Sequence, residues 1–357
     1  MTRTEAPVEH IMRIGIYVSH FPRISETFIQ RLVLGLLEEG HDVTIIADRR
    51  APESQYQDTT ARVLRAARVV YRGRIASRWP VRLLQALGVA VRTCFYDPAA
   101  TIHCLSPRRF GVYALSFYPF LEAAPFIVHG SDLDIVHAQY GHLGLRLAKL
   151  LPALKPSWKL AVSFRGNDIS SGLKKRGREG YRELSDRGDL FLPVSEYFRK
   201  RLLTLGFPKS KVHVLRSGIQ LADYSQTYSR GRPNEGFQIV TVGRLNRKKG
   251  IDYCLKGFAL FVSTAPADSA AASAMLSVIG DGPERAPLEH LAESLDVAKH
   301  VTFLGSMKHS SAMSTLSASH VFLNHSVVGP NGDEEGIPNV LKEAYLCGLP
   351  VVASRHS

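Results

Sequence analysis

Two glutamates near the end of the chain, Glu335 and Glu343, bracket a segment that can bind an anion. Within it, Gly336 permits a turn, and Pro338 suits the first position of a helix because its missing N–H would be unpaired there. The backbone N–H groups that follow point outward at a helix N-terminus and attract negative charge. The residues of this segment that we predict to take part in ligand binding are Gly336, Ile337, Pro338, Asn339 and Val340.

Three interpretations of the glutamate pair follow from this spacing. As solvated acids near a helix start, the two carboxylates would only complement the helix dipole. As a general acid and base, they would correspond to the paired carboxylates of glycoside hydrolysis. As hydrogen-bond acceptors, they would hold neighbouring hydroxyl groups on either side of a bound diphosphate. Basic residues elsewhere in the chain favour the third interpretation.

These basic residues lie at the end of the strand that is expected at Gln238–Leu245 and in the segment after it. Arg244 lies at the end of that strand, and Lys249 stands beside Gly250 where the next helix opens. Both are expected at the carboxyl edge of the sheet, as is Glu335. An arginine fork and a lysine point charge both bind phosphate oxygens, and together they would neutralise a departing diphosphate without a metal. Taken alone, a basic loop of this kind is more often plain surface.

Hydrophobic periodicity predicts alternating strands and helices along most of the chain. Residues 13–19 form a β-branched run, residues 26–39 carry apolar side chains on one helical face, and residues 42–47 form a second strand. This βαβ opening predicts a parallel sheet. Further strands are expected at Asp134–Ala138, Leu160–Phe164, Leu190–Val194, Lys211–Leu215, Gln238–Leu245, Met275–Gly280, Val301–Gly305, His320–Asn324 and Pro350–Ser354. The predicted fold class is α/β, with two Rossmann-like doubly wound domains facing across a cleft.

The domain boundaries follow from a loss of periodicity in the middle of the chain. Residues 218–236 are polar and aperiodic, which is typical of a linker. We therefore predict an N-terminal, acceptor-side domain at residues 1–217 and a C-terminal domain at residues 237–357. The chain stops directly after the last predicted strand, which indicates that the second domain is incomplete.

The composition is that of a globular protein with a basic surface. The 357 residues carry a formal net charge of +13, and residues 59–96 contain eight arginines and no acid. The run from Arg62 to Arg92 predicts either a basic amphipathic surface for an anionic membrane or a solvated face with snorkelling arginines. Nucleic acid is not predicted as a partner, because no nucleic-acid motif accompanies the charge. The four scattered cysteines indicate a reducing compartment.

Four spaced motifs occur in a fixed order in the second half of the chain. They are Val242-Gly243-Arg244-Leu245 with Lys249-Gly250, Ile279-Gly280-Asp281-Gly282-Pro283-Glu284, Val301-Thr302-Phe303-Leu304-Gly305, and Glu335-Gly336-Ile337-Pro338 with Glu343-Ala344. This order resembles that of the retaining glycosyltransferases of family four. The early segment Phe21-Pro22-Arg23-Ile24-Ser25-Glu26-Thr27-Phe28 is similar to a subgroup that includes colanic-acid and other exopolysaccharide glycosyltransferases.

The resemblance implies the GT-B fold and transfer of a sugar with retention of its anomeric configuration. By this analogy Glu335 contacts the donor sugar and Glu343 the nucleotide ribose. Arg244 and Lys249 then bind the diphosphate. The family is thought to use front-face attack assisted by the leaving phosphate, so no dedicated general base is implied. No cofactor is expected, since the nucleotide sugar is a substrate.

Two short motifs are set aside. Asp132-Leu133-Asp134 resembles a metal-binding sequence of the other large glycosyltransferase fold, but it precedes its strand instead of following it, so no metal site is predicted. Gly280 and Gly282 lack the third glycine of a dinucleotide fingerprint, so a nicotinamide cofactor is not expected.

One position departs from the family pattern. Where many members have His-Gly-x-Asp, this chain has Arg165-Gly166-Asn167-Asp168. Arg165 cannot act as a neutral hydrogen-bond partner of the sugar, but it suits a phosphate or an acidic acceptor; alternatively, the segment is only a tight turn. His137 follows another strand and is a candidate cleft residue, although a histidine in that position is more often structural. The candidate catalytic residues are Glu335, Arg165 and His137, and the candidate acceptor-side residues are Ser25, Glu26 and Asp168.

The leading hypothesis is sugar transfer from a nucleotide-sugar donor to a polysaccharide or lipid-linked oligosaccharide. The expected location is the cytoplasm, peripheral on the inner face of the cell membrane. The alternative is a non-catalytic protein that keeps the fold and binds sugar nucleotides or a membrane. Donor binding without turnover would distinguish this alternative.

Overall fold

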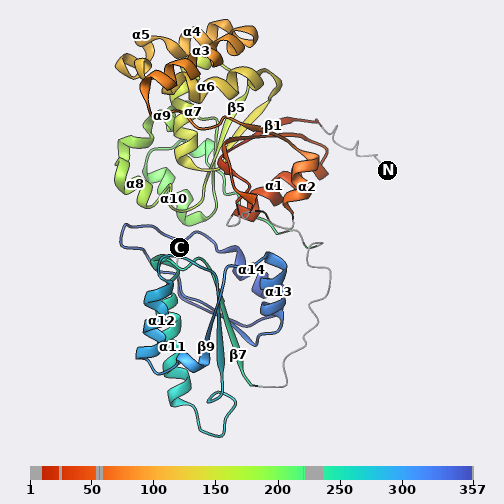
Figure 1. The fold of residues 1–357 in the computed structure, drawn as a ribbon, viewed down its shortest axis with the longest axis vertical. Helices are drawn as coiled ribbons and strands as arrows, with labels where there is room; N and C mark the ends of the chain where they lie inside the picture. The colour runs from red at the N-terminus through yellow and green to blue at the C-terminus, as the bar shows by residue number, and fades with distance from the viewer. Residues whose placement is uncertain are drawn as a thin grey trace. The chain divides into compact units, whose positions relative to one another are not determined.

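Two parallel β-sheets organise the chain in the computed structural model (Figure 1), which describes residues 10–23, 26–53, 56, 59–219, 221 and 236–355. Each sheet belongs to one of two units. The first unit comprises Met1–Phe164, Arg176–Pro193 and Arg199–Leu215, and the second comprises Arg165–Lys175, Val194–Phe198 and Arg216–Ser357. Most of the segment predicted as a linker lies outside the described residues.

The strands are β1 (Arg13–Phe21), β2 (Asp42–Arg50), β3 (Arg68–Tyr71), β4 (Ile135–Ala138), β5 (Lys159–Phe164), β6 (Leu190–Pro193), β7 (Gln238–Val242), β8 (Met275–Ile279), β9 (Val301–Gly305), β10 (Val321–Asn324) and β11 (Val351–Ala353). The helices of the first unit include α1 (Thr27–Glu38), α2 (Thr60–Ala66), α3 (Trp79–Tyr96), α4 (Pro98–Leu105), α5 (Pro107–Phe110), α6 (Tyr118–His129), α7 (Gly141–Leu154) and α9 (Arg182–Arg187). Two further helices are α8 (Ser171–Arg176) and α10 (Glu196–Thr204), and the remaining ones are α11 (Ile251–Thr264), α12 (Arg285–Ser294), α13 (His309–Ser317) and α14 (Asn339–Leu346).

The first sheet has the strand order β3-β2-β1-β4-β5-β6, with every pair of neighbours parallel. Its strands form because β-branched and aromatic runs are buried on both faces; the neighbouring Ile16 and Tyr17 of β1, which point to opposite faces, are 0% and 2% exposed. Helix α1 packs Ile29 and Val33 into the same core. This is the order of a doubly wound sheet, and it reverses direction between β1 and β4.

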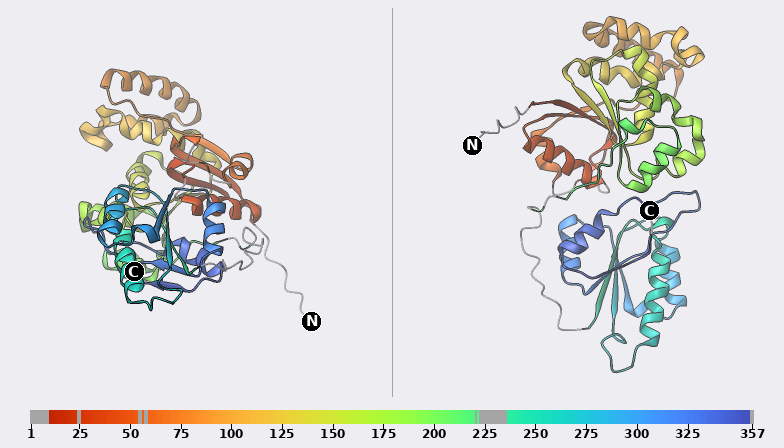
Figure 2. Two further views of the ribbon diagram at one scale, coloured as in Figure 1. Left: turned by 60° about the horizontal axis from the view of Figure 1, so that its bottom comes forward. Right: turned by 180° about the vertical axis from the view of Figure 1, so that it is seen from behind.

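The second sheet has the order β11-β10-β7-β8-β9, again parallel throughout. In Figures 1 and 2, α11 and α12 cover one face of this sheet, and α13 and α14 cover the other. The side chains of Leu255 and Phe258 on α11 are buried against Leu276 and Val278 of β8. The strand order reverses between β7 and β10. The predicted α/β class with two doubly wound domains is therefore confirmed.

Three local predictions need correction. Lys211–Leu215 is not a strand. Two of its backbone N–H groups donate to β6, but Val212 alone forms a β-bridge with β6, and one bridge does not make a ladder of paired strands. Strand β3 was missed, because Arg68–Tyr71 is only four residues long within the arginine run. Pro338 is the residue before α14 and not its first residue, with an extended ψ of 125°.

The run from Arg62 to Arg92 is not one helical face. It spans α2, β3, a connecting loop and most of α3. The side chain of Arg82 is buried and its Nη1 donates to the carbonyl oxygens of Ala76 and Ser77 at 3.0 and 3.2 Å. Neither interpretation of this run, a membrane-binding surface or a solvated face, therefore holds for Arg82, which fixes that loop.

The described residues contain no single helix that is long and apolar enough to cross a membrane. One bent pair of helical segments, Pro107–Ser116 and Tyr118–Asp132, passes the same criteria by length and composition, with a bend of 108° between them.

Candidate functional site

The reversal point of the second sheet gathers the predicted donor-binding residues. Strands β7 and β10 are neighbours there, and both end at the same edge. The loop after β7 carries Arg244 and Lys249, and the loop after β10 carries Glu335 before the chain enters α14. Ligands of doubly wound sheets bind outside the carboxyl ends of the strands at such a point. The topology therefore explains why residues 86 positions apart in the sequence meet.

A cluster of two lysines and two carboxylates occupies this edge. Lys249 Nζ lies 3.0 Å from Glu335 Oε2, and Lys248 Nζ lies 3.6 Å from the same atom. Lys248 Nζ also lies 3.1 Å from Asp333 Oδ2. The four side chains are only 15–18% exposed. We call Lys248, Lys249, Asp333 and Glu335 the lysine–carboxylate cluster.

The backbone that carries the two lysines is fixed by a glycine. Residues Arg247–Lys249 form a 3₁₀ turn, and Gly250 then adopts the left-handed conformation, with φ 57°, before α11 begins. A Cβ on Gly250 would overlap the carbonyl oxygen of His325, so no other residue fits without moving the loop after β10. The N–H of Val327 donates to the Lys248 carbonyl at 2.9 Å. The two loops are therefore joined through backbone as well as through side chains.

A second close approach joins the loops after β7 and β8. The Gly243 N–H donates to the Ile279 carbonyl, and the Leu245 N–H donates to the Asp281 carbonyl, at 2.9 and 3.0 Å. Gly280 has a φ of 131°, and a Cβ there would overlap the Gly243 carbonyl oxygen. Gly280 therefore has a structural role: because it has no Cβ, the loop after β8 can approach the Gly243 carbonyl in the loop that carries Arg244.

Glu335 is held in its ionised form. Burial alone would raise its pKa, but the opposing effects of Lys249 and Lys248, through charge and hydrogen bonding, leave that pKa below its ordinary value of 4.5. A carboxylate that stays charged is a hydrogen-bond acceptor and not a proton donor. The cluster therefore suits the binding of hydroxyl groups better than general acid catalysis.

The second predicted glutamate sits on α14, one of the helices on the opposite face from α11. Glu343 is 8% exposed, and its Oε1 lies 3.0 Å from His309 Nε2 at the start of α13. No acidic residue occupies the first turn of α14, so the outward backbone N–H groups after Pro338 are not offset by a neighbouring negative charge on the helix itself. Glu335 therefore precedes α14 in the chain and Glu343 lies on that helix, paired with His309.

Sequence reasoning found part of this site. The structure brings Lys249 together with Glu335, whereas Arg244 is exposed and takes part in none of the ion pairs found among the described residues. Lys248, Asp333 and His309 were missed. A signal existed for the first two, because Lys248 adjoins Lys249 and Asp333 lies two residues before Glu335. No spacing rule pointed to His309. The roles of all these residues in binding a donor remain predictions.

The reversal point of the first sheet contains one of the predicted acceptor-side residues. Glu26, at the start of α1, is 8% exposed, and its Oε1 accepts from the Tyr140 hydroxyl at 3.0 Å. Arg23 Nη1 lies 3.3 Å from the same oxygen. Tyr140 follows β4, the neighbour of β1. As in the second sheet, residues from the segments that follow two neighbouring strands meet at the point where the strand order reverses. Ser25 lies outside the described residues.

The other first-half candidates have clear structural contacts. His137 lies within β4, is 6% exposed, and has its Nε2 2.8 Å from the Ser163 hydroxyl oxygen on β5. Asp168 is 3% exposed and its Oδ1 accepts from the backbone N–H groups of Arg165 and Gly166, both at 3.0 Å. Arg165 Nη1 donates to the Ser217 hydroxyl at 3.0 Å. Asp168 thus stabilises the turn that carries Arg165, which was one of the two interpretations of this segment.

In the part of the chain that the structure describes, no three His, Cys, Asp or Glu side chains come together in a group able to hold a metal ion.

Two family models match almost the whole chain. The model described as Glycosyltransferase Family 4 matches residues 25–223, and the model described as Glycosyl transferases group 1 matches residues 226–357. The chain is 27% identical to a protein of Salmonella typhimurium named as a colanic acid biosynthesis glycosyltransferase, WcaL, over 97% of this chain and 83% of that one. It is 26% identical, with the same coverage, to the amylovoran biosynthesis glycosyltransferase AmsK of Erwinia amylovora.

Solved structures agree on the architecture. The chain matches the Anabaena protein HepE, crystallised in complex with UDP-glucose, with a TM-score of 0.63 and 15% identity over 97% of this chain and 81% of HepE. It matches WaaG, a glycosyltransferase involved in lipopolysaccharide biosynthesis, with a TM-score of 0.57 and 14% identity over 95% and 80% of the two chains. The fold is therefore the GT-B fold of glycosyltransferases. The chain belongs to glycosyltransferase family 4.

The first prediction concerns the ionisation of Glu335. Wild-type Glu335 should titrate below 4.5, so its contribution to stability is present above that pH and is lost as the pH falls through the lower, folded-state pKa. Replacing Lys249 with Met removes the nearest cation and leaves the burial, so the pKa of Glu335 should rise. Carboxyl-selective NMR titration, assigned with E335Q, measures both values.

Lys256→Met is the matched control, because Lys256 is 53% exposed on α11 and contacts Asp252 and the Tyr253 ring, with no ion pair to the lysine–carboxylate cluster. It should leave the Glu335 titration unchanged. An unchanged Glu335 pKa in the Lys249→Met variant would contradict the proposed electrostatic coupling.

Proposed function

We propose that this protein transfers a sugar from a nucleotide-sugar donor to a polysaccharide or lipid-linked oligosaccharide, with retention of anomeric configuration and without a resident metal or cofactor. One observation carries the proposal: a buried carboxylate, Glu335, is held charged by Lys248 and Lys249 beside the start of α14. The class of product is supported by the names of two relatives, which refer to colanic acid biosynthesis and to amylovoran biosynthesis.

Each part of a nucleotide sugar has a complementary group in this site. The positive charges of Lys248 and Lys249 suit the diphosphate and offset the negative charge of the departing nucleotide. In other enzymes a bound metal ion supplies this positive charge. The backbone N–H groups at the start of α14 add further donors for phosphate oxygens. Glu335 accepts hydrogen bonds from hydroxyls of the sugar, and Glu343 accepts them from the ribose. Arg244 is exposed on the loop after β7, where it is available to the phosphates.

The reaction follows from this placement. The bond between the sugar C1 and the diphosphate oxygen breaks, and the acceptor hydroxyl oxygen bonds to C1 from the same face. The acceptor proton passes to the oxygen of the departing diphosphate. Glu335 orients the sugar without taking a proton, which agrees with its lowered pKa. Glu26 and Tyr140, at the reversal point of the first sheet, are proposed acceptor contacts.

We further propose that the protein works at the cytoplasmic face of a membrane, on the basis of an exposed apolar surface. Large apolar side chains of α3, α4 and the segment after α5 lie in solvent, and we call them the apolar ledge. They are Trp79, Val81, Leu84, Leu87, Val91, Phe95, Tyr96, Ile102, Val112, Tyr113 and Leu115. Residues 59–121 contain ten arginines and a single acid, Asp97. Exposed apolar side chains with surrounding cations are typical of surfaces that bind anionic lipid bilayers.

Donor turnover should depend on Glu335. In Glu335→Gln the carboxylate loses its charge but keeps its shape, so the hydrogen bond to the sugar weakens. Because a hydrogen bond to a charged group is worth about 1.5–3 kcal/mol, turnover should fall about 10- to 100-fold. Release of nucleoside diphosphate from UDP-glucose, UDP-galactose and GDP-mannose, with a bacterial lipid extract as the source of acceptor, measures the effect.

Glu293→Gln is the control, because Glu293 is 69% exposed on α12 and lies outside the cluster. It should behave as wild type. Equal turnover in Glu335→Gln and wild type would contradict the proposal that Glu335 binds the donor sugar. Donor binding with no turnover in the wild-type protein would favour the non-catalytic alternative.

Membrane binding should depend on the apolar ledge. Replacing Leu84, Leu87 and Val91 with Ser removes apolar area from the outer side of α3, so flotation with phosphatidylglycerol vesicles should fall strongly. The control Leu260→Ser alters a comparably exposed residue on α11, at 66% against 69% for Leu84, and should float normally. Replacing the exposed arginines between Arg62 and Arg92 with Gln should weaken binding as well. Flotation that survives both sets of changes would show that this surface is only solvated.

A further inference from the structure

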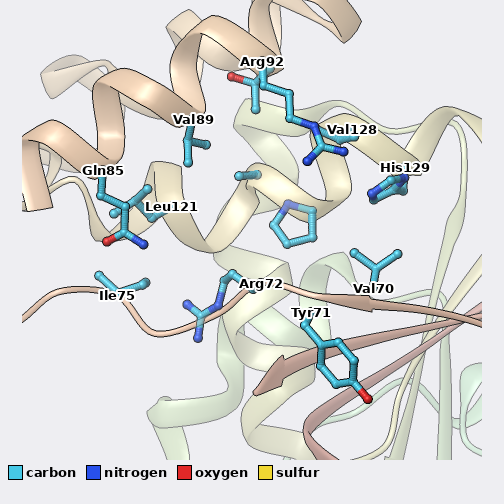
Figure 3. A pocket seen from close by; sticks show the side chains of 13 residues that line it. Val70, Tyr71, Arg72, Ile75, Gln85, Val89, Arg92, Leu121, Val128 and His129 are labelled. Atoms are coloured by element: carbon cyan, nitrogen blue, oxygen red, sulfur yellow. The ribbon is translucent and has the colours of Figure 1, made fainter. Parts of the chain in front are cut away.

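A pocket in the first unit shares no lining residue with the polar groups described at either reversal point. It opens between the end of β3, helix α3 and helix α6, and has a volume of about 120 Å³ (Figure 3). A single water needs far less space than this, so the pocket admits a chemical group of several heavy atoms. Neither Glu26 nor the lysine–carboxylate cluster lines it.

Three basic side chains line this pocket: Arg72, Arg92 and His129. Figure 3 shows Arg92 extending from α3 toward His129, which ends α6. None of the described lining residues is acidic. Arg72 is paired with Asp48, which lies outside the lining, whereas Arg92 has no acidic residue beside it in the lining. An excess of basic groups of this kind favours an anionic ligand.

An ion pair with Asp48 holds the Arg72 side chain in place. Its Nε lies 3.2 Å from Asp48 Oδ1, and its side chain is only 12% exposed. Asp48 is already engaged, because its oxygens also accept from the Tyr17 hydroxyl at 3.2 Å and from Arg146 at 2.6 Å. Arg72 Nη1 is buried and has no hydrogen bond to any residue that the structure describes. A buried donor without a partner is costly, and an anion in the pocket would supply one.

His129 provides a second oriented donor. Its Nδ1 lies 3.2 Å from Arg68 Nη2, and arginine can only donate, so Nδ1 must be the acceptor. The neutral ring therefore carries its proton on Nε2. Burial lowers the pKa of His129, and the charges of Arg68 and Arg92 lower it further. A bound anion would reverse part of this effect, which gives a spectroscopic signature for the site.

The rest of the lining is apolar. Val70, Val89, Leu121 and Val128 contribute hydrocarbon surface from β3, α3 and α6. Gln85 fixes the loop at the edge of the pocket, accepting from the Ala76 N–H at 3.1 Å and donating to the Arg74 carbonyl at 3.0 Å. A free inorganic anion would gain nothing from this hydrocarbon surface, whereas a phosphate that carries an alkyl chain would.

We infer that this pocket binds the phosphate headgroup and the first carbons of an anionic lipid. Arg92 and the Nε2–H of His129 bind the phosphate oxygens, Arg72 adds positive charge elsewhere in the lining, and the valines and Leu121 contact the attached hydrocarbon. The site is separate from the proposed donor site, and its occupation does not depend on sugar transfer. The inference deepens the proposed membrane association and rests on it, whereas it does not depend on sugar transfer. A protein that floats with anionic vesicles but does not bind soluble phosphatidic acid would overturn this inference alone.

Calorimetry on the full chain tests the inference with soluble probes. Dihexanoyl phosphatidic acid, below its micelle concentration, should bind with a measurable affinity, and inorganic phosphate and dihexanoyl phosphatidylcholine should bind much more weakly. Arg92→Gln should weaken phosphatidic acid binding by about tenfold, the loss expected for one charge-assisted contact. Arg182→Gln removes the same charge from a 74% exposed site on α9 and should change nothing.

A second variant and a second measurement guard against misfolding. Val89→Trp fills the pocket without changing charge, so it should abolish binding while circular dichroism and the melting temperature stay near wild type. Histidine NMR should show the pKa of His129 rising when phosphatidic acid binds. Binding that survives both Arg92→Gln and Val89→Trp would overturn the inference. Inorganic phosphate that binds as tightly as phosphatidic acid would overturn the assignment to a lipid.

Discussion

The interaction on which the proposed donor site depends is the pair of ionic contacts from Lys248 and Lys249 to Glu335. A carboxylate that is 17% exposed stays charged only if cations compensate for the water it has lost. The same lysines are the groups that suit a diphosphate, so one cluster serves both purposes. Without a ligand the positive charges stabilise Glu335, and a bound donor would share them between its phosphates and the carboxylate.

Doubly wound topology makes this cluster possible. Neighbouring strands β7 and β10 end side by side, and their loops meet although a long stretch of chain separates them. The meeting requires glycine at two close approaches, Gly250 beside the His325 carbonyl and Gly280 beside the Gly243 carbonyl. The same topology in the first unit brings Glu26 against Tyr140. Both sheets thus use the reversal of strand order to concentrate polar groups at one edge.

Sequence patterns predicted the features that depend on local periodicity. Strongly apolar segments such as β1 and β8 were placed within a few residues, and the β7-to-α11 loop was recognised as basic. The features that the sequence did not predict depend on tertiary contacts. Nothing local distinguishes Arg82, which is buried against the loop that it fixes, from the exposed arginines around it. The pairing of His309 with Glu343 joins two residues that are 34 positions apart on different helices, and it has no sequence signature.

The most direct test of the central claim compares a donor with its own nucleotide. Calorimetry should measure the affinities of wild type, Glu335→Gln and Lys249→Met for UDP-glucose and UDP, and for GDP-mannose and GDP. If Glu335 holds the sugar, Glu335→Gln should bind the free nucleotide as wild type does but lose the extra affinity that wild type has for the nucleotide sugar. If Lys249 holds the diphosphate, Lys249→Met should bind both the nucleotide and the nucleotide sugar more weakly. Equal losses for donor and nucleotide in Glu335→Gln, or no loss in either variant, would contradict this account.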